Sequence, residues 1–160
     1  MLQAPGIKRF NLSTTGLNSP YDDNPINYFL GLKITAIMTK KQRRILVVDD
    51  NEDSAEVTAI LLRSEGHEVI VAHTGPDAIK QVSVALPDVL LLDIGLPDMD
   101  GYDLARQLRK LPETRHAVLI ALTGYGRPED LQQSKIAGFD HHLLKPIEPS
   151  ALIDLIALLR

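Results

Sequence analysis

Short apolar runs alternate with amphipathic stretches along most of this chain. A mostly apolar run is typical of a strand whose sheet is covered on both faces, as parallel sheets are. The chain contains five such runs, and we predict a strand in each: 44–50, 68–72, 89–93, 117–123 and 139–145.

Each predicted strand precedes a segment in which apolar residues recur at the three- and four-residue spacing of a helix. Four of these segments carry a clear apolar face that we expect to pack on the sheet. Segment by segment, these residues are Val57, Ile60 and Leu61; Ala78, Ile79, Val82 and Leu86; Leu104, Leu108 and Leu111; and Leu152, Ile156 and Leu159.

Capping and turn residues mark the ends of the helices. Asp53 with Glu56 resembles a capping pair for the first helix, and Asp100 is placed to cap the third. Proline is tolerated in a first helical turn, and it begins three of the helices, at Pro76, Pro128 and Pro149. Glycine or proline ends four of them, at Gly66, Pro87, Pro112 and Gly138.

Five strand–helix units in strict alternation predict an α/β fold in which a parallel sheet carries helices on both faces. The carboxyl ends of parallel strands meet at one edge of such a sheet, where open α/β folds hold ligands. No glycine-rich phosphate loop follows the first strand, which disfavours the nucleotide-binding versions of this architecture.

The composition fits one globular domain with an extension. Of the 160 residues, 44% are hydrophobic and 24% are charged, and the absence of cysteine excludes disulfides, thiol catalysis and cysteine-based zinc sites. Residues 1–43 carry six Lys/Arg and two Asp, so residues 44–160 hold the other 11 Lys/Arg and 19 Asp/Glu, a net charge of −8. This acidic body argues against non-specific nucleic-acid binding, which needs a basic face.

Residues 1–42 differ from the remainder of the chain. Gly, Pro, Asn, Ser and Thr are scattered through 3–25 without a sustained period, which predicts an irregular or disordered extension before a domain at 43–160. The more apolar stretch 26–38 is shorter than the roughly 20 residues of a membrane span, so we expect no membrane partner. Met38 as the natural start is an alternative that the sequence leaves open.

Polar side chains close four of the five predicted strands. They are Asp49 and Asp50 after the first, Asp93 at the third, Thr123 at the fourth and Lys145 at the fifth. Three carboxylates in one cleft repel each other unless a cation is present, and oxygen ligands without His or Cys suit Mg²⁺. Mg²⁺ and an ammonium would stabilise a transferring phosphoryl group. The pattern therefore predicts that Asp93 is a nucleophilic carboxylate that takes up a phosphoryl group.

Other polar residues near the strand ends have simpler interpretations. An isolated acid after a strand is most often a helix cap or a solvated loop residue, and we interpret Asp53 and Asp98 in this way. His141 and His142 are adjacent in a predicted strand, so their side chains point to opposite faces and do not chelate one ion together.

This constellation, in this order, resembles the receiver domain of bacterial two-component response regulators. The resemblance covers roughly residues 43–160 and rests on Asp49-Asp50, the 92–97 segment around Asp93, Asp100-Gly101, Thr123 and Lys145-Pro146. It implies a flavodoxin-like doubly wound sheet, (βα)5, with strand order 2-1-3-4-5. The blocks 121–126 and 138–146 are most similar to receivers attached to hybrid sensor histidine kinases.

The resemblance also implies a role for each residue of the site. Asp93 would be the phosphoacceptor, Lys145 would pair with the phosphoryl oxygens, and Thr123 would move its hydroxyl onto them. The bond between Lys145 and Pro146 would be cis. The Mg²⁺ ligands would be Asp49, Asp50, Asp93 and the backbone carbonyl of Gly95.

The chain departs from the family pattern in one position above all. His142 stands three residues before Lys145, where the family often has Tyr or Phe, so a conventional aromatic switch is in doubt. Gly95 and Tyr125 occupy the two positions that flank the route of the attacking water, where Tyr125 would shield the phosphate.

We therefore expect a stand-alone cytoplasmic receiver that accepts phosphate from a histidine kinase or a histidine phosphotransfer protein. It would signal to an unknown protein target through altered contacts around the fourth helix, fifth strand and fifth helix, and would not otherwise be an enzyme. An aspartate-nucleophile phosphohydrolase is one alternative, against which Gly95 counts because such enzymes carry a second acid there. A receiver-like interaction module that is never phosphorylated is another.

Overall fold

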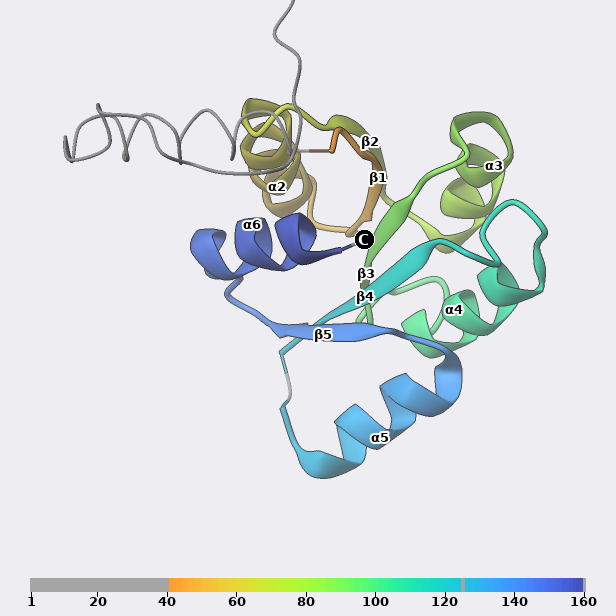
Figure 1. Cartoon of the computed structure of the whole chain (residues 1–160). Helices are drawn as coiled ribbons and strands as arrows, with labels where there is room; N and C mark the ends of the chain where they lie inside the picture. Colours follow the sequence, from red (N-terminus) through yellow and green to blue (C-terminus); the bar gives the residue numbers. More distant parts are fainter. Residues whose placement is uncertain (1–40, 125, 160) are drawn as a thin grey trace, which may run out of the picture. The chain divides into compact units, whose positions relative to one another are not determined.

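The computed structural model describes residues 41–124 and 126–159, in which strands and helices alternate (Figure 1). The strands are β1 (Arg44–Val48), β2 (Glu68–Ala72), β3 (Val89–Asp93), β4 (Val118–Thr123) and β5 (His141–Leu144). The helices are α2 (Glu52–Ser64), α3 (Gly75–Ala85), α4 (Gly101–Lys110), α5 (Pro128–Ala137) and α6 (Pro149–Leu158). The predicted irregular extension falls almost entirely on residues 1–40, outside the described residues.

The five strands form one parallel sheet in the order β2-β1-β3-β4-β5, which confirms the predicted fold class and topology. In the register of this sheet Val48 pairs with Leu92, and Thr123 pairs with Leu144. Strands β1, β3, β4 and β5 therefore end at nearly the same level, which brings the polar residues after them to one edge.

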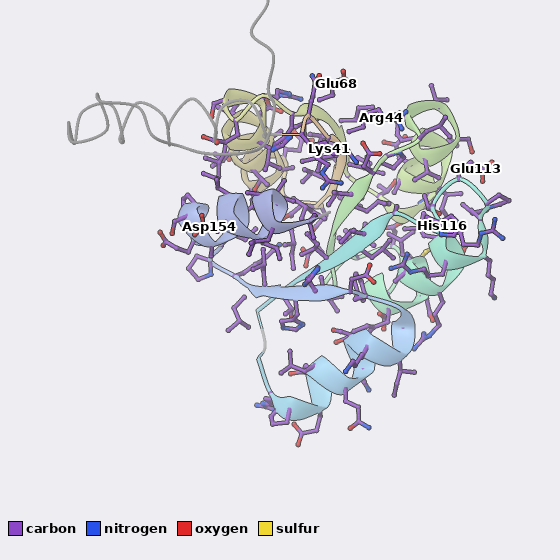
Figure 2. The ribbon with its side chains drawn as sticks, viewed as in Figure 1. Lys41, Arg44, Glu68, Glu113, His116 and Asp154 are labelled. Carbon is purple, nitrogen blue, oxygen red and sulfur yellow. The ribbon has the colours of Figure 1, made fainter. Side chains whose placement is uncertain are left out.

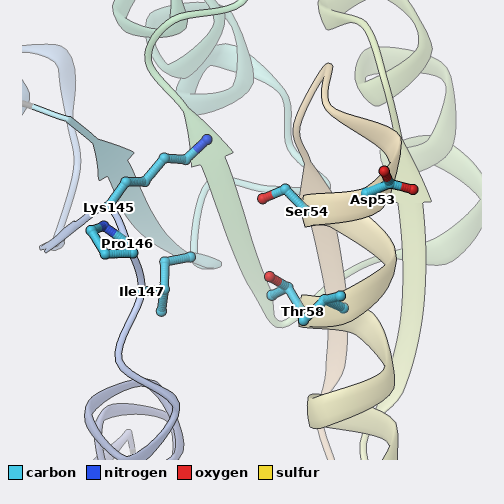
Figure 3. A pocket seen from close by; sticks show the side chains of 7 residues that line it. Asp53, Ser54, Thr58, Lys145, Pro146 and Ile147 are labelled. Atoms are coloured by element: carbon cyan, nitrogen blue, oxygen red, sulfur yellow. The ribbon is translucent and has the colours of Figure 1, made fainter.

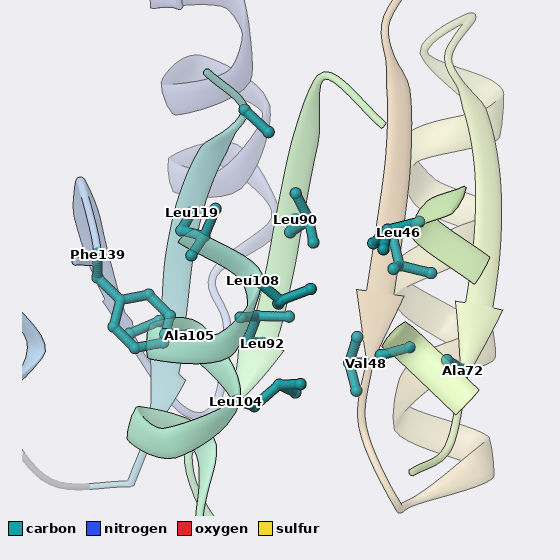
Figure 4. Packing of buried hydrophobic residues seen from close by; sticks show 14 of the residues in the cluster. Leu46, Val48, Ala72, Leu90, Leu92, Leu104, Ala105, Leu108, Leu119 and Phe139 are labelled. Carbon is teal, nitrogen blue, oxygen red and sulfur yellow. The ribbon is translucent and has the colours of Figure 1, made fainter. Parts of the chain in front are cut away.

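Alternate residues of the strands enter two apolar clusters, one on each face of the sheet. Figure 4 shows the first, in which Leu46, Leu90 and Leu92 pack against α3 and α4. The second lies between the sheet and the pair α2 and α6. It is built on the intervening strand positions, among them Ile45, Val47, Leu91, Ile120 and Leu122. Both faces are therefore covered, as the apolar strands predicted.

The buried face of α2 differs from the predicted one. Val57 and Ile60 are 68% and 57% exposed, so the expectation that they pack on the sheet is wrong. The fully buried face is formed by Ala55, Ala59 and Leu62, with Thr58 beside them. The small alanines allow the helix backbone to lie close to the sheet, which leaves the larger branched residues on the outer side.

Two helix ends also differ from the prediction. Asn51, not Asp53, caps α2, because its side chain accepts a hydrogen bond from the Ser54 amide at 2.8 Å. Leu86 was predicted to be buried, but it is 44% exposed. It ends α3 in a left-handed backbone conformation. The caps at Asp100 and Gly138 are confirmed.

Charged side chains line the outside of the domain, including the labelled Arg44, Glu113 and Asp154 in Figure 2. Among the described residues, no helix combines the length and apolar character needed to cross a bilayer.

Candidate functional site

The site lies where four strands end at the carboxyl edge of the sheet. Asp49 and Asp50 follow β1, Asp93 is the last residue of β3, Thr123 is the last of β4, and Lys145 follows β5. Parallel pairing continues beyond the strands, since the Lys145 amide donates to the Thr123 carbonyl at 2.7 Å. The sequence prediction that these five residues come together is therefore correct.

Lys145 joins the two buried carboxylates of the site. Its Nζ donates to Asp49 Oδ2 and to Asp93 Oδ2, both at 2.8 Å. Asp49 is 1% exposed and Asp93 is 8% exposed, so these charges are largely removed from water. An ammonium shared by two buried carboxylates offsets the repulsion between them. The bond between Lys145 and Pro146 is cis, as the resemblance implied.

The two carboxylates also set the protonation of the lysine. Burial by itself lowers the pKa of Lys145, but the hydrogen bonds that its ammonium donates to Asp49 and Asp93, together with the attraction to their charges, outweigh burial and hold that pKa above its ordinary value. The raised pKa favours the charged form of Lys145, which is the form that pairs with both carboxylates.

Three carboxylates are grouped closely enough to hold one metal ion. Asp49, Asp50 and Asp93 each offer an oxygen within 4.8 Å of the others, and Asp50 is exposed to solvent while the other two are buried. Oxygen donors with one open side fit Mg²⁺, which keeps several of its waters. The Gly95 amide donates to Asp93 Oδ1 at 2.9 Å, which places the loop after β3 beside this carboxylate.

Gly101 brings the start of α4 against the end of β3. A Cβ at this position would lie 2.5 Å from the carbonyl oxygen of Asp93 and 2.6 Å from Cα of Ile94. The Gly101 amide donates to the Ile94 carbonyl at 3.2 Å, so α4 begins directly against the backbone that carries Asp93. Only glycine allows this approach, which accounts for the Asp100-Gly101 motif.

The β4–β5 side of the site combines a buried hydroxyl with a half-buried histidine. Thr123 is 4% exposed at the end of β4. His142, one strand away, shares a contact of 3.3 Å between its Nδ1 and Ser134 Oγ of α5, and its buried Nε2 has no hydrogen-bond partner. His142 is therefore a part of the packing between β5 and α5. The prediction about Tyr125 falls outside the described residues.

Sequence reasoning missed three polar residues around the site. Ser54 Oγ donates to Asp49 Oδ2 at 3.1 Å, and the His73 Nδ1 lies 3.0 Å from the Asp49 carbonyl oxygen. Asp98, which we interpreted as a cap or solvated residue, accepts a hydrogen bond from the Gly75 amide at 3.0 Å. His73 lies in the turn before α3 and Gly75 is the first residue of that helix, positions without apolar periodicity, so no pattern in the sequence pointed to these contacts.

A cleft of about 340 Å³ opens beside Lys145. Figure 3 shows Lys145, Pro146 and Ile147 on one wall and Ser54 and Thr58 of α2 across from them. The outer residue of the α2 wall is Val57, which is 68% exposed. The cleft therefore connects solvent and an exposed apolar helix face to the lysine that contacts Asp93.

A family model described as the response regulator receiver domain matches residues 45–157. The response regulator PleD of Caulobacter vibrioides is 38% identical over 105 residues, which make up 66% of this chain and 23% of PleD. The CAI-1 autoinducer sensor kinase/phosphatase CqsS of Vibrio cholerae is 32% identical over 120 residues, 74% of this chain and 18% of CqsS. The chain thus spans less than a quarter of the length of these two relatives.

A solved structure shares both fold and sequence with this chain. The response regulator receiver domain protein (CheY-like) from Methanospirillum hungatei JF-1 superimposes with a TM-score of 0.67 at 34% identity. The match covers 72% of this chain and 91% of that one. The similarity therefore extends over the whole sheet and its helices.

Proposed function

Because this chain belongs to the response regulator receiver domain family, and is a phosphoacceptor receiver of two-component signalling, we propose that Asp93 is the residue that accepts the phosphoryl group. The observation that supports this most directly is the position of its carboxylate. Asp93 lies between a lysine 2.8 Å away and two further acids within 4.8 Å, at the edge of the sheet that faces a cleft.

The chain's own residues supply most of what the transfer needs. An oxygen of Asp93 forms the new P–O bond as the P–N bond of a phosphohistidine breaks, and the electron pair and a proton end on the donor imidazole. Lys145 then exchanges a carboxylate partner for a phosphoryl oxygen, and the Thr123 hydroxyl provides a further contact. The Gly95 amide holds the other oxygen of Asp93 at 2.9 Å and so fixes the orientation of the nucleophile.

We propose Asp49, Asp50, Asp93 and the Gly95 carbonyl as the ligands of Mg²⁺. When bound, Mg²⁺ would neutralise charge on the carboxylates and on the phosphoryl oxygens. The donor set fits this ion, because it consists of oxygens alone and has one exposed member.

We propose that the donor is a histidine kinase or a histidine phosphotransfer protein that reaches Asp93 along the cleft beside α2. Val57 lines that cleft and Ile60 lies further along the same helix, and both are exposed apolar residues, which suits contact with an apolar helix face. A cytoplasmic location goes with this proposal, since phosphohistidine donors are made from ATP. The protein would have no enzymatic activity beyond its own phosphorylation and dephosphorylation.

The decisive experiment is intact mass after incubation with phosphoramidate, with Mg²⁺ or with EDTA, for wild type, Asp93→Asn and the matched control Asp103→Asn on the exposed face of α4. We expect one added phosphoryl group, roughly 80 Da, in wild type and the control, and none in Asp93→Asn or in EDTA. An adduct that persists in Asp93→Asn would overturn the assignment.

A second experiment tests the donor surface. Val57→Asp should slow phosphoryl transfer from a phosphorylated histidine phosphotransfer domain by about tenfold, as expected for a charge placed in an apolar contact, and leave transfer from phosphoramidate unchanged. Equal loss with both donors would show that the substitution damages the acceptor site and not the contact with the donor.

A further inference from the structure

The β2–α3 turn, which consists of His73, Thr74 and the first residue of α3, Gly75, contacts both loops that carry the proposed metal ligands. His73 Nδ1 lies 3.0 Å from the carbonyl oxygen of Asp49, so that nitrogen carries a proton and donates it. Two residues later, the Gly75 amide donates to Asp98 Oδ2 at 3.0 Å. Both contacts join segments that are more than 20 residues apart in the chain.

The first of these contacts holds the loop after β1. That loop places Asp49 and Asp50, and its conformation is also held by the Asn51 amide, which donates to Asp49 Oδ1 at 3.0 Å. The His73 contact holds the main chain of Asp49 to the segment that follows the edge strand β2.

The second contact holds the loop after β3. That loop runs from Ile94 to Asp100, and its two ends are joined by the hydrogen bond from the Gly101 amide to the Ile94 carbonyl. Asp98 lies in the middle of the loop, three residues after Gly95, and its bond to Gly75 anchors that middle. An exposed loop with an anchored middle samples fewer conformations, which lowers the entropy lost when it binds a ligand.

The lack of a side chain at Gly75 allows this contact. A Cβ at Gly75 would lie 3.1 Å from Met99 Sδ, 3.2 Å from Met99 Cβ and 3.5 Å from Asp98 Oδ2. The loop after β3 therefore packs on the start of α3 closely enough that a larger residue would push it away.

We propose that His73 and Asp98 are positioning residues for Mg²⁺, which act together by linking both metal-bearing loops to the β2–α3 turn. This inference rests on the proposed function of the Asp49, Asp50 and Asp93 cluster. Neither side chain needs to touch the ion. His73 holds the backbone of Asp49, and Asp98 holds the loop that carries Gly95. Polar groups that orient ligands in this way affect metal affinity strongly.

The test measures Mg²⁺ binding to the unphosphorylated protein by calorimetry, and the Mg²⁺ dependence of phosphoryl uptake from phosphoramidate. We expect Asp98→Ala, His73→Ala and Gly75→Ala each to weaken Mg²⁺ binding by about threefold to tenfold. The maximal rate at saturating Mg²⁺ should stay within about twofold of wild type, because Asp93, Thr123 and Lys145 are unchanged.

Two further variants separate the loss of these hydrogen bonds from a loss of charge and from a loss of stability. Asp98→Asn keeps an acceptor oxygen and should restore most of the affinity, which a pure effect of charge would not do. Thr74→Ala removes the side chain that caps α3 by accepting from the Asp77 amide, but leaves both links in place. It should lower the melting temperature without changing Mg²⁺ affinity.

The double variant His73→Ala/Asp98→Ala should lose less affinity than the product of the two single losses, because both act through one turn. The inference is overturned if Asp98→Ala binds Mg²⁺ with the affinity of wild type. It is also overturned if Asp98→Asn or Thr74→Ala binds Mg²⁺ as weakly as Asp98→Ala does. A wild-type protein that neither binds Mg²⁺ nor takes up phosphate would instead overturn the proposed function, and this inference with it.

Discussion

Helices α4 and α5 have the same length and follow neighbouring strands, but they are anchored very differently. Both span 10 residues, and each follows a strand that ends in a residue of the site, Asp93 for α4 and Thr123 for α5. The residues that α4 buries are Gly101, Leu104, Ala105 and Leu108. Those that α5 buries are Ser134 and Ala137, while its large residues Leu131 and Ile136 are 47% and 71% exposed.

This difference divides the site into a fixed part and a weakly anchored part. A segment with few buried apolar contacts opens at a lower free-energy cost than one with many. Asp93, the proposed acceptor, therefore lies beside the firmly packed α4, whereas Thr123 precedes the lightly packed α5. We expect phosphorylation to change the region of α5 and β5, which is part of the α5, β5 and α6 surface predicted from the sequence, and to leave α4 in place.

The largest expected effect is the difference in stability loss between truncating an apolar residue of α4 and truncating one of α5. Leu104 is fully buried in the cluster of Figure 4, so Leu104→Ala should lower the free energy of unfolding by about 2–5 kcal/mol. Ile136→Ala on α5 should change it by less than about 0.5 kcal/mol, because Ile136 faces solvent. Urea denaturation of both variants measures the difference. Equal losses would contradict the division of the site into two parts.

The next effect concerns the contact between α4 and the acceptor strand. Gly101→Ala should destabilise the protein by about 1–3 kcal/mol, because its Cβ would overlap the backbone of Asp93 and Ile94, which has little room to move. It should also slow phosphoryl uptake, measured by intact mass over time. Gly124→Ala, where no atom lies within 4 Å of the added Cβ, is the control and should be close to neutral.

A smaller effect tests what holds α5. Ser134→Ala removes the contact between Ser134 Oγ and His142 Nδ1, and since the Nε2 of that ring already has no partner, neither ring nitrogen then has one. A buried polar group that loses its partner costs about 1–3 kcal/mol, so Ser134→Ala should lower stability by that amount. Faster amide exchange in α5 but not in α4 should accompany the loss. Uniform exchange across both helices would argue against a local anchor.

The smallest effect is expected for His142→Phe. The substitution removes the buried Nε2 that has no partner, and it also removes the contact with Ser134. These two changes oppose each other, so the free energy of unfolding should change by less than about 1 kcal/mol in either direction. Thermal unfolding at neutral pH measures it. A loss as large as that of Ser134→Ala would mean that the hydrogen bond of the histidine stabilises α5 beyond what its burial costs.

The sequence predicted the strands and the chemistry at their ends well, because both depend on local patterns. A mostly apolar run followed by an acid, a hydroxyl or an amine is visible in the sequence, and parallel pairing then requires those ends to meet. The helix faces were predicted less well. In α2 the two most exposed branched residues, Val57 and Ile60, were expected inside, since periodicity alone does not tell a face covered by small residues from one covered by large residues.

The sequence by itself therefore determined the alternation of strands and helices, the positions of Asp49, Asp50, Asp93, Thr123 and Lys145, and the family to which they point. Only the tertiary structure decided that Lys145 bridges Asp49 and Asp93, that His73 and Gly75 join the two loops, and that α5 is held by a serine and an alanine. The physical reason is one of range. Strand and helix preferences act over a few residues, but Lys145 and Asp49 are 96 positions apart, and their contact depends on the packing of every element between them.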